Sequence, residues 1–534
     1  MVRKWDRRPL PCPAPMKARS SPSEEGMPVP VRQRPLVLKY EPLGRGTRAD
    51  VLVYPVSVRQ GKVRLPRDPR LPEALADAAR TLALRHHAVR QAGSIDDIVL
   101  PPGAPFSRLV LVGLGEETPS RPVDVRNAAA AAMEWAARHR ASRVAVHVEA
   151  LTELAGPDAI AGWIEGAVLS TFRFYEHRTQ LGDDPRPPAG TLIFVSSKPV
   201  PRKARAAGEA ARITAESVNL ARSLGHEPPN VLNPVTLARR AQAIAQRYRL
   251  RCRVIDHRAM KARRMGAILA VGSGSAVPPR IIVLEHKPAG RRGRPIVLVG
   301  KAVTHDTGGY SIKPTASMLE MKYDKCGGMA VIGSLVAAAR LKLRRHVIGV
   351  IGAADNAISG SAYRPSDIIR AGNGKTIEVL DTDAEGRLVL ADCLHYAETT
   401  WKPAVIIDLA TLTGACTVAL GDACAALLSS HDDLAKALHA SGERTGERLW
   451  RMPLWPVYRE QIAGVDADLK NVGGRLAGTI TAAMFLKEFV TEKTPWAHLD
   501  IAGVANTAKA LPICPVGATG FGVRLLMDYL RGLE

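Results

Sequence analysis

The sequence is poor in aromatic residues, which make up only 4% of its 534 residues. No stretch approaches the roughly 18 consecutive apolar residues that a membrane-spanning helix requires. The basic residues near the start are not followed by an apolar segment of about 7 to 15 residues, so a secretory signal peptide is not expected. These absences predict a cytoplasmic protein with no membrane partner.

Paired cysteines are also lacking, because the seven cysteines are scattered and form no CxxC motif. An odd number of unpaired cysteines in a long chain argues against a disulfide framework and against a structural zinc cluster. We therefore expect free, reduced thiols.

Acidic residues are outnumbered, with 51 Asp and Glu against 74 Lys and Arg, which gives a net charge of +23. Such a balance favours anionic partners such as DNA. However, the basic residues are interleaved with acidic ones, and few aromatic side chains are available to stack on bases. Two interpretations stay open: a DNA-binding protein, or a solvated, arginine-rich surface.

Composition and periodicity distinguish four segments. Residues 1–35 are rich in Pro, Arg and Ser, and we expect a disordered extension because they have too few apolar side chains to offset the entropy of ordering. Residues 36–200 alternate strand-like and helical runs, which predicts an N-terminal α/β domain. Residues 201–234 are expected to form a linker helix and a connection that contains several prolines. In residues 235–534, near-continuous apolar strands alternate with helices, which predicts a three-layer αβα sandwich with a central mixed sheet.

The octamer DTDAEGRL, residues 381–388, crowds Asp381, Asp383 and Glu385 on alternate positions. In an extended stretch, residues two apart point to the same side, so these carboxylates would repel one another. Either nearby positive charges compensate these carboxylates, or the octamer is a solvated turn.

Further charged residues follow other predicted strands, where ligands of open α/β sheets usually bind. The strand RPIVLVG is expected to end in a loop, residues 301–314, that carries Lys301, His305, Asp306 and Lys313. Asp324 precedes a Gly-Gly pair that opens a predicted helix. Carboxylates gathered at strand ends are readily stabilised by divalent cations. A pair of such cations can activate a water molecule and polarise a carbonyl or phosphoryl oxygen.

Five motifs, in order and spacing, resemble those of the leucyl (cytosol) aminopeptidase family, the two-metal M17 peptidases: GKAVTHDTGGYSIKP, MKYDKCGG, DTDAEGRLVLAD, DLATLTGA and WAHLDIAG. The resemblance extends from about residue 205 nearly to the end, which identifies residues 235–534 as the catalytic peptidase domain. It implies an aminopeptidase that releases N-terminal amino acids, Leu-like ones preferred, from peptides through a water activated by two metal ions. It also implies a homohexamer whose active sites face an inner cavity.

The resemblance implies a role for each matching residue. Two divalent ions, Mn²⁺ or Zn²⁺, would be held by Lys301, Asp306, Asp324, Asp383 and Glu385. Lys313 would polarise the scissile carbonyl or stabilise its oxyanion, and Arg387 would hold a bicarbonate ion that accepts the proton of the attacking water. The pocket for the substrate side chain would be lined by Met321, Thr411, Gly414, Ala502 and Ala505.

The sequence departs from the family pattern at Asp381, where most members have Asn, and at His305, where Phe is common. An added carboxylate can shift the pKa of its neighbours. A histidine beside a metal ligand more often supports that ligand than binds the metal. Two alternatives to the peptidase remain: a DNA-binding regulatory protein on the same fold, with or without peptidase activity, and a two-metal phosphoesterase, which is disfavoured because such sites usually use histidines.

Overall fold

The computed structural model describes most of the chain beyond the N-terminal extension. The predicted disordered segment 1–35 lies outside the described residues, except for its last residue. The described part up to Phe174 and from residue 190 onward belongs to one compact unit, and no helix in the described part is both long and apolar enough to cross a membrane. The described ranges are 35–43, 46–59, 62–66, 72–85, 91–116, 120–180, 190–290 and 293–534.

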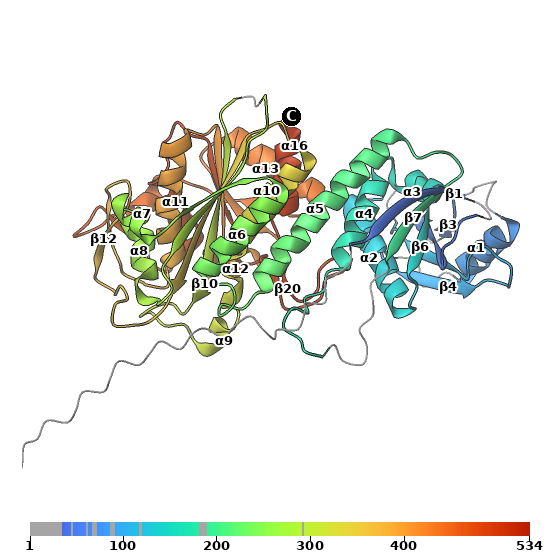
Figure 1. Ribbon diagram of the computed structural model, residues 1–534, viewed down its shortest axis with the longest axis horizontal. Coiled ribbons are helices and arrows are strands. Elements are labelled where there is room, and N and C mark those ends of the chain that lie inside the picture. Colours follow the sequence, from blue (N-terminus) through green and yellow to red (C-terminus); the bar gives the residue numbers. More distant parts are fainter. Residues whose placement is uncertain are drawn as a thin grey trace, which may run out of the picture. The chain divides into compact units, whose positions relative to one another are not determined.

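The first sheet has the strand order β1-β7-β6-β2-β5-β4, with β3 paired to β2 (Figure 1). The neighbours from β1 to β5 are parallel, and β4 and β3 are antiparallel to their partners. This is the α/β domain that the alternating pattern predicted. Its strands are β1 (Val37–Pro42), β2 (Val51–Arg59), β3 (Lys62–Arg64), β4 (Ile95–Val99), β5 (Arg108–Gly113), β6 (Arg143–His147) and β7 (Thr191–Ser196), and its helices are α1 (Glu73–Arg85), α2 (Pro122–Arg138), α3 (Val148–Ala155) and α4 (Ala159–Ser170).

The second sheet has eight strands in the order β16-β15-β18-β14-β10-β11-β9-β8. The central strands β18, β14, β10 and β11 are parallel, whereas β9 is antiparallel to β11 and β15 is antiparallel to β18, so the sheet is mixed, as predicted. The strands are β8 (Arg251–Ile255), β9 (Arg280–His286), β10 (Ile296–Asp306), β11 (Val347–Asn356), β14 (Val405–Ala410), β15 (Ala425–Ser429), β16 (Leu449–Arg451) and β18 (Trp496–Asp500).

Helices cover both faces of this sheet (Figure 1). Successive residues of β10 lie in two different hydrophobic cores. Leu298 packs in one core with α10, and Val299 packs in the other with α11. Because a strand points successive side chains to opposite faces, this double burial explains the near-continuous apolar runs and confirms the three-layer sandwich. The helices are α5 (Arg202–His226), α6 (Pro234–Tyr248), α7 (His257–Ala262), α8 (Gly266–Val271), α9 (Thr315–Met318), α10 (Cys326–Leu341), α11 (Glu385–Trp401), α12 (Gly414–Leu420), α13 (Asp432–Thr445), α14 (Val457–Glu460), α15 (Gly478–Lys487) and α16 (Val523–Gly532).

Two short sheets complete the described secondary structure. One joins β12 (Ile368–Arg370), β13 (Thr376–Glu378) and β17 (Leu469–Lys470), and the other joins β19 (Asn506–Thr507) and β20 (Gly517–Ala518). The first of them leads directly into residues 381–384, the turn that precedes α11.

Glycines hold the start of α10 against the sheet. A Cβ atom on Gly300 would lie 2.5 Å from Gly328 Cα, and one on Gly327 would lie 2.1 Å from the carbonyl oxygen of Leu409. Only residues without a Cβ allow backbones to approach this closely. The close packing of α10 on β10 and β14 brings Asp324, two residues before the helix, next to the middle of β10.

The expectation that Lys301 lies in a loop was wrong. Strand β10 continues to Asp306, because β11 remains paired with it from Ile296 to Asp306 even though β14 pairs only as far as Gly300. The octamer is likewise not extended: it forms a turn and then the first turn of α11, which begins at Glu385.

Candidate functional site

A cavity of about 480 Å³ opens at the carboxyl end of the second sheet. Its lining includes all five predicted metal ligands together with Lys313. Four of the five residues predicted to contact the substrate side chain also line it, namely Met321, Thr411, Gly414 and Ala502. The fifth, Ala505, is buried and is not part of the lining, and neither is the buried Arg387.

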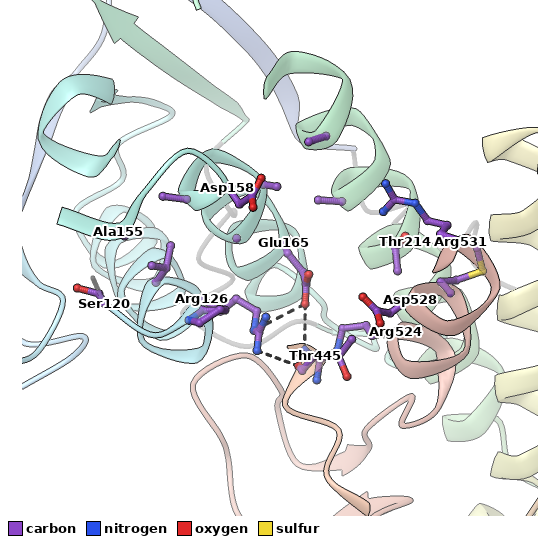
Figure 2. Close-up of a pocket in the computed structure, with 18 residues that line it drawn as sticks. Ser120, Arg126, Ala155, Asp158, Glu165, Thr214, Thr445, Arg524, Asp528 and Arg531 are labelled. Carbon is purple, nitrogen blue, oxygen red and sulfur yellow. Dashed lines mark hydrogen bonds and ion pairs between the residues drawn. The ribbon is translucent and has the colours of Figure 1, made fainter. Parts of the chain in front are cut away.

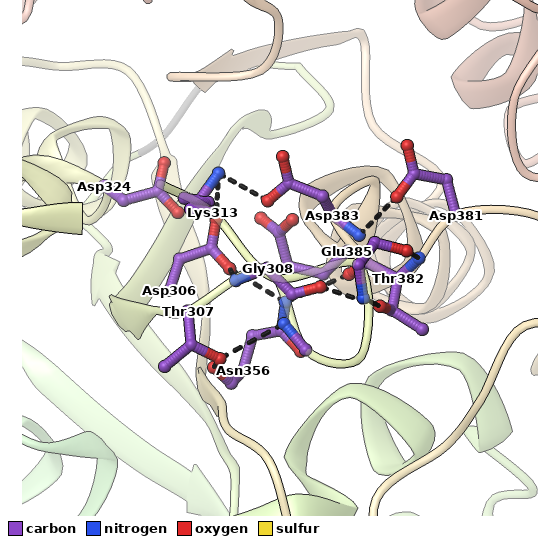
Figure 3. Close-up of polar contacts among 12 residues, drawn as sticks. Asp306, Thr307, Gly308, Lys313, Asp324, Asn356, Asp381, Thr382, Asp383 and Glu385 are labelled. Carbon is purple, nitrogen blue, oxygen red and sulfur yellow. Dashed lines mark hydrogen bonds and ion pairs between the residues drawn. The ribbon is translucent and has the colours of Figure 1, made fainter. Parts of the chain in front are cut away.

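Three carboxylates form the core of the site. Asp306 comes from the end of β10, Asp324 precedes α10, and Glu385 is the first residue of α11. One oxygen from each of the three lies within 4.8 Å of the others, and all three residues are buried (Figure 3). His305 is not part of this group. Three segments, of which the outermost are 79 residues apart in sequence, therefore place their negative charges close together.

Two lysines form ion pairs with these carboxylates. Lys301 Nζ lies 2.7 Å from Asp324 Oδ1 and 2.8 Å from Glu385 Oε1, and it donates a 2.8 Å hydrogen bond to the carbonyl oxygen of Thr411. Burial opposes the charged form of Lys301, but the surrounding carboxylates outweigh it and raise the pKa of the ammonium group above its usual value.

Lys313 bridges the other side of the cluster (Figure 3). Its Nζ lies 2.9 Å from Asp306 Oδ2 and also contacts Asp383 Oδ1. As with Lys301, burial disfavours its charge, and the neighbouring acids, Asp306 first, raise its pKa. Both lysines are therefore held as cations at an acidic centre.

The two lysines do not fully compensate the acids. Burial raises the pKa of Asp324 to about 6, although Lys301 opposes the shift. Burial and the Asp306 carboxylate raise the pKa of Glu385 to about 8. Burial, with the Asp306 carboxylate next, also raises the pKa of Asp383. Raised carboxyl pKa values mean that additional positive charge would be stabilising here.

The donor atoms fit a divalent cation. Asp324 Oδ2 is buried and has no hydrogen-bond partner among the described residues, although a buried polar atom is normally paired. Carboxylate oxygens are ligands that hard and intermediate divalent cations accept, and Mn²⁺ is among them. The residues present therefore suit the metals that the family resemblance implies.

Neighbouring polar groups orient the carboxylates. Asp306 Oδ1 accepts hydrogen bonds from Gly308 N at 2.9 Å and from Asn356 Nδ2 at 2.8 Å, which leaves Oδ2 facing Lys313. Asp324 Oδ1 accepts a 2.7 Å bond from Thr411 Oγ1. Asn356 and this role of the Thr411 hydroxyl were not predicted from the sequence. Asn356 ends β11 beside Asp306, so the strand-end rule would have found it.

Asp381 does not join the three central carboxylates. Its Oδ1 accepts a 2.8 Å hydrogen bond from the backbone N–H of Asp383 and so shapes the turn before α11 (Figure 3). An asparagine oxygen would accept the same bond.

Arg387 lies on the first turn of α11 and is held from the opposite side by Asn471. Arg387 Nη1 donates a 2.7 Å hydrogen bond to the Asn471 carbonyl oxygen. Burial lowers the pKa of the guanidinium to about 10, and Arg387 Nε has no hydrogen-bond partner among the described residues. The sequence analysis also missed Asn471, which is more than 80 residues away in sequence.

Known proteins resemble the whole architecture. The family model described as "Cytosol aminopeptidase family, catalytic domain" matches residues 219–527, and the model of the N-terminal domain of the same family matches residues 53–180. A probable cytosol aminopeptidase of Geobacter sp. (strain M21) is 45% identical over 427 residues, which cover 80% of this chain and 86% of the relative. Another from Desulfovibrio desulfuricans is 38% identical over 491 residues, or 91% of this chain and 97% of the relative.

A solved structure is similar to most of the chain. The bottromycin maturation enzyme BotP in complex with Mn is 32% identical and superposes with a TM-score of 0.77, covering 91% of this chain and 99% of that one. With the fold, the acidic cavity and these relatives together, the chain belongs to the cytosol aminopeptidase family and is a peptidase.

Proposed function

We propose that this peptidase is a metal-dependent aminopeptidase that releases N-terminal amino acids, preferably Leu-like ones, from peptides. The observation that carries the proposal is the buried cluster of Asp306, Asp324 and Glu385 at the base of the cavity, with Asp324 Oδ2 unpaired among the described residues. A buried carboxylate without a partner is costly unless a cation balances it.

Five residues would hold two divalent ions, Mn²⁺ or Zn²⁺. Lys301, Asp306, Asp324 and Glu385 would surround one, with Lys301 as the neutral amine once the cation displaces its proton, and Asp306, Asp383 and Glu385 would surround the other. Metal ions bound in such a pair supply an activated water and polarise the peptide carbonyl. The similar BotP structure is a complex with Mn, which supports the use of a divalent cation by this chain.

Lys313 stabilises negative charge on the carbonyl oxygen of the substrate. Its ammonium group is largely buried, with 15% of the side chain exposed, and it lines the cavity. A donor fixed in a place with little water is far more effective than one in bulk solvent, and removing such a donor in other hydrolases costs roughly 3–4 kcal/mol of transition-state stabilisation.

Arg387 would hold a bicarbonate ion, which accepts the proton of the attacking water. The buried guanidinium has an N–H at Nε that no described residue uses, while Asn471 fixes the other side of the group. Arginine suits a planar, three-oxygen anion because its N–H groups are also planar.

The cavity walls favour a substrate with an apolar side chain and a free amino group. Met321, Thr411, Gly414 and Ala502 offer small or apolar surfaces to a side chain. The acidic wall attracts the α-amino group, a basic nitrogen that an N-acylated peptide lacks. Selectivity for the N-terminal residue follows from this charge complementarity.

The test compares Leu-p-nitroanilide with its N-acetyl derivative after removal and restoration of metal. We expect hydrolysis of the first compound only, loss of activity on chelation, and recovery with Mn²⁺ or Zn²⁺. Glu385→Ala should abolish activity, because it removes a carboxylate proposed to contact both cations. Full activity in the chelated enzyme or in Glu385→Ala would refute the two-metal assignment.

A second candidate function, DNA binding on the same fold, is favoured by the net charge of +23. Binding that neutralises DNA phosphates weakens steeply with salt. Affinity for duplex DNA that falls at least tenfold between about 50 mM and 200 mM salt would support this candidate. Absence of binding at the lower salt concentration would exclude it.

We also infer that the enzyme is a cytoplasmic homohexamer that acts on peptide substrates. Light scattering on the purified chain should give six times the 57.3 kDa chain mass. A monomer or dimer would contradict the inference.

A further inference from the structure

A second cavity, of about 340 Å³, is drawn in Figure 2 and shares no lining residue with the acidic cavity. It is lined by residues of α2, α4, α5 and α16 and by Thr445 at the end of α13. Its volume falls within the roughly 300–1,000 Å³ typical of small-molecule sites. Neither the peptidase reaction nor the metal cluster uses any of these residues.

The floor of this cavity is a network of buried charges. Arg524 Nη1 donates to Glu165 Oε1 at 2.9 Å and to the Thr445 carbonyl oxygen at 2.7 Å. Arg126 Nη2 donates to the same carbonyl oxygen at 2.8 Å (Figure 2). Behind them, Arg524 Nε lies 3.3 Å from Glu447 Oε1. The network fixes the orientation of both guanidinium groups.

Two atoms of the floor remain available to a ligand. Arg126 is only 4% exposed, yet its Nε has no hydrogen-bond partner among the described residues and lies 3.7 Å from Glu165 Oε1. Both arginine contacts of Glu165 within the described chain use Oε1, which leaves Oε2 as an acceptor. A buried donor and a neighbouring acceptor thus stand side by side.

The entrance of the cavity also carries one acidic and one basic side chain. Asp158 and Arg531 lie on opposite sides of the cavity (Figure 2). Both are exposed, and neither makes an ion pair within the described part of the chain. The cavity is also lined by apolar side chains, among them Val125, Ala161 and Met527, and by the polar Ser120, Thr214 and Asp528.

We propose that this cavity binds a free amino acid with an apolar side chain. The carboxylate of such a zwitterion would be held at the floor by Arg126 Nε, its ammonium by the adjacent Glu165, and its side chain by the apolar residues of the lining. A simple anion would leave the acidic groups without a partner and would meet repulsion from Glu165. A simple cation would fail in the same way at the arginines, so a molecule with both charges fits best.

The ligand class has a natural source, since free amino acids are what an exopeptidase releases. The site itself does not depend on the metal cluster, and its occupancy can be measured without any catalysis. Failure of the proposed aminopeptidase function and failure of this binding site are therefore distinguishable.

Equilibrium dialysis of the full-length, Mn²⁺-loaded protein against radiolabelled L-leucine tests the proposal, because it counts bound leucine per chain. We expect Ala161→Phe, which fills the cavity, to bind one leucine fewer than the parent. Arg126→Lys should weaken that same site about tenfold or more, because it removes the donor to a charged carboxylate. Arg239→Gln, an exposed change on α6, should leave the binding curve unchanged.

The charge requirement is tested with two truncated probes, 4-methylpentanoic acid, which lacks the ammonium group, and 3-methylbutylamine, which lacks the carboxylate. Each should displace leucine from this site at least tenfold less well than leucine itself does. Thermal melting confirms that Ala161→Phe and Arg126→Lys are folded, and the Arg126 variant provides the answer if Ala161→Phe is not. An unchanged leucine count in Ala161→Phe, or unchanged affinity in Arg126→Lys, overturns the proposal.

Discussion

The substitution Gly386→Ala should disturb the acidic site while the fold stays intact. A Cβ atom at position 386 would lie 2.6 Å from Lys301 Cε and 2.7 Å from Nζ, whereas ordinary contacts begin at 3.4 Å. The Lys301 side chain must therefore move, and its end is flexible enough for the backbone to stay in place. Nζ cannot move that far and keep all three of its short contacts, with Asp324, Glu385 and the Thr411 carbonyl oxygen.

The expected magnitude follows from those contacts. A hydrogen bond to a charged group contributes about 1.5–3 kcal/mol, so the loss of one should weaken Mn²⁺ binding or slow peptide hydrolysis about 10- to 150-fold. Stability should change little, because alanine is favoured over glycine in a helix by up to about 1 kcal/mol and this gain offsets part of the crowding.

The assay measures Mn²⁺ affinity by calorimetry, hydrolysis of Leu-p-nitroanilide, and the melting temperature of the same preparation. Gly532→Ala is the matched control, since a Cβ there meets nothing within 4 Å and the residue also lies in a helix. Parent-like Mn²⁺ affinity and activity in Gly386→Ala would show that the position of Lys301 is not critical and would refute the reasoning.

Three further outcomes are expected. Thr411→Val keeps the side-chain shape but removes the hydroxyl that donates to Asp324 Oδ1, and should weaken Mn²⁺ binding about 10- to 100-fold by calorimetry; an unchanged affinity would mean that Asp324 needs no such support. Protons compete with Mn²⁺ at Asp324 and Glu385, whose pKa values are raised to about 6 and about 8. Affinity should therefore rise from about pH 6 to about pH 9, and titrations in buffers of different ionisation enthalpy should show proton release; a flat profile would contradict this. Asp381→Asn should keep activity within about twofold, because the amide oxygen still accepts a hydrogen bond from Asp383 N. Asp381→Ala should lower activity. Equal losses of activity in the two variants would show that the charge of Asp381 matters instead.

Much of the acidic site could be predicted from the sequence because strand ends and helix starts are local features. Apolar runs marked the central strands, and the carboxyl ends of parallel strands share one edge of a sheet, so Asp306 and Asp324 were expected near the octamer. The pairing of Lys301 with Asp324 and Glu385 agrees with the need for positive charge. The conformation of the octamer was left open, because alternating acids suit an extended chain and a turn equally well.

Features that depend on distant segments escaped prediction. Arg126 meets the carbonyl oxygen of Thr445 across 319 positions of sequence, and Arg387 meets Asn471 across 84. Periodicity and composition report on neighbours within a few residues, so they contain no information about such contacts. The second cavity depends on such contacts, because its lining runs from Ser120 to Arg531.

The two lysines of the acidic cluster have a consequence for how the protein matures. Lys301 and Lys313 each contact two carboxylates, so the polypeptide carries its own counterions. We therefore expect that folding does not have to wait for a cation and that any cation binds late and reversibly. We therefore expect a chelator to stop hydrolysis while the melting transition stays cooperative, which would make metal supply, and not synthesis, the faster way to control how much enzyme is active.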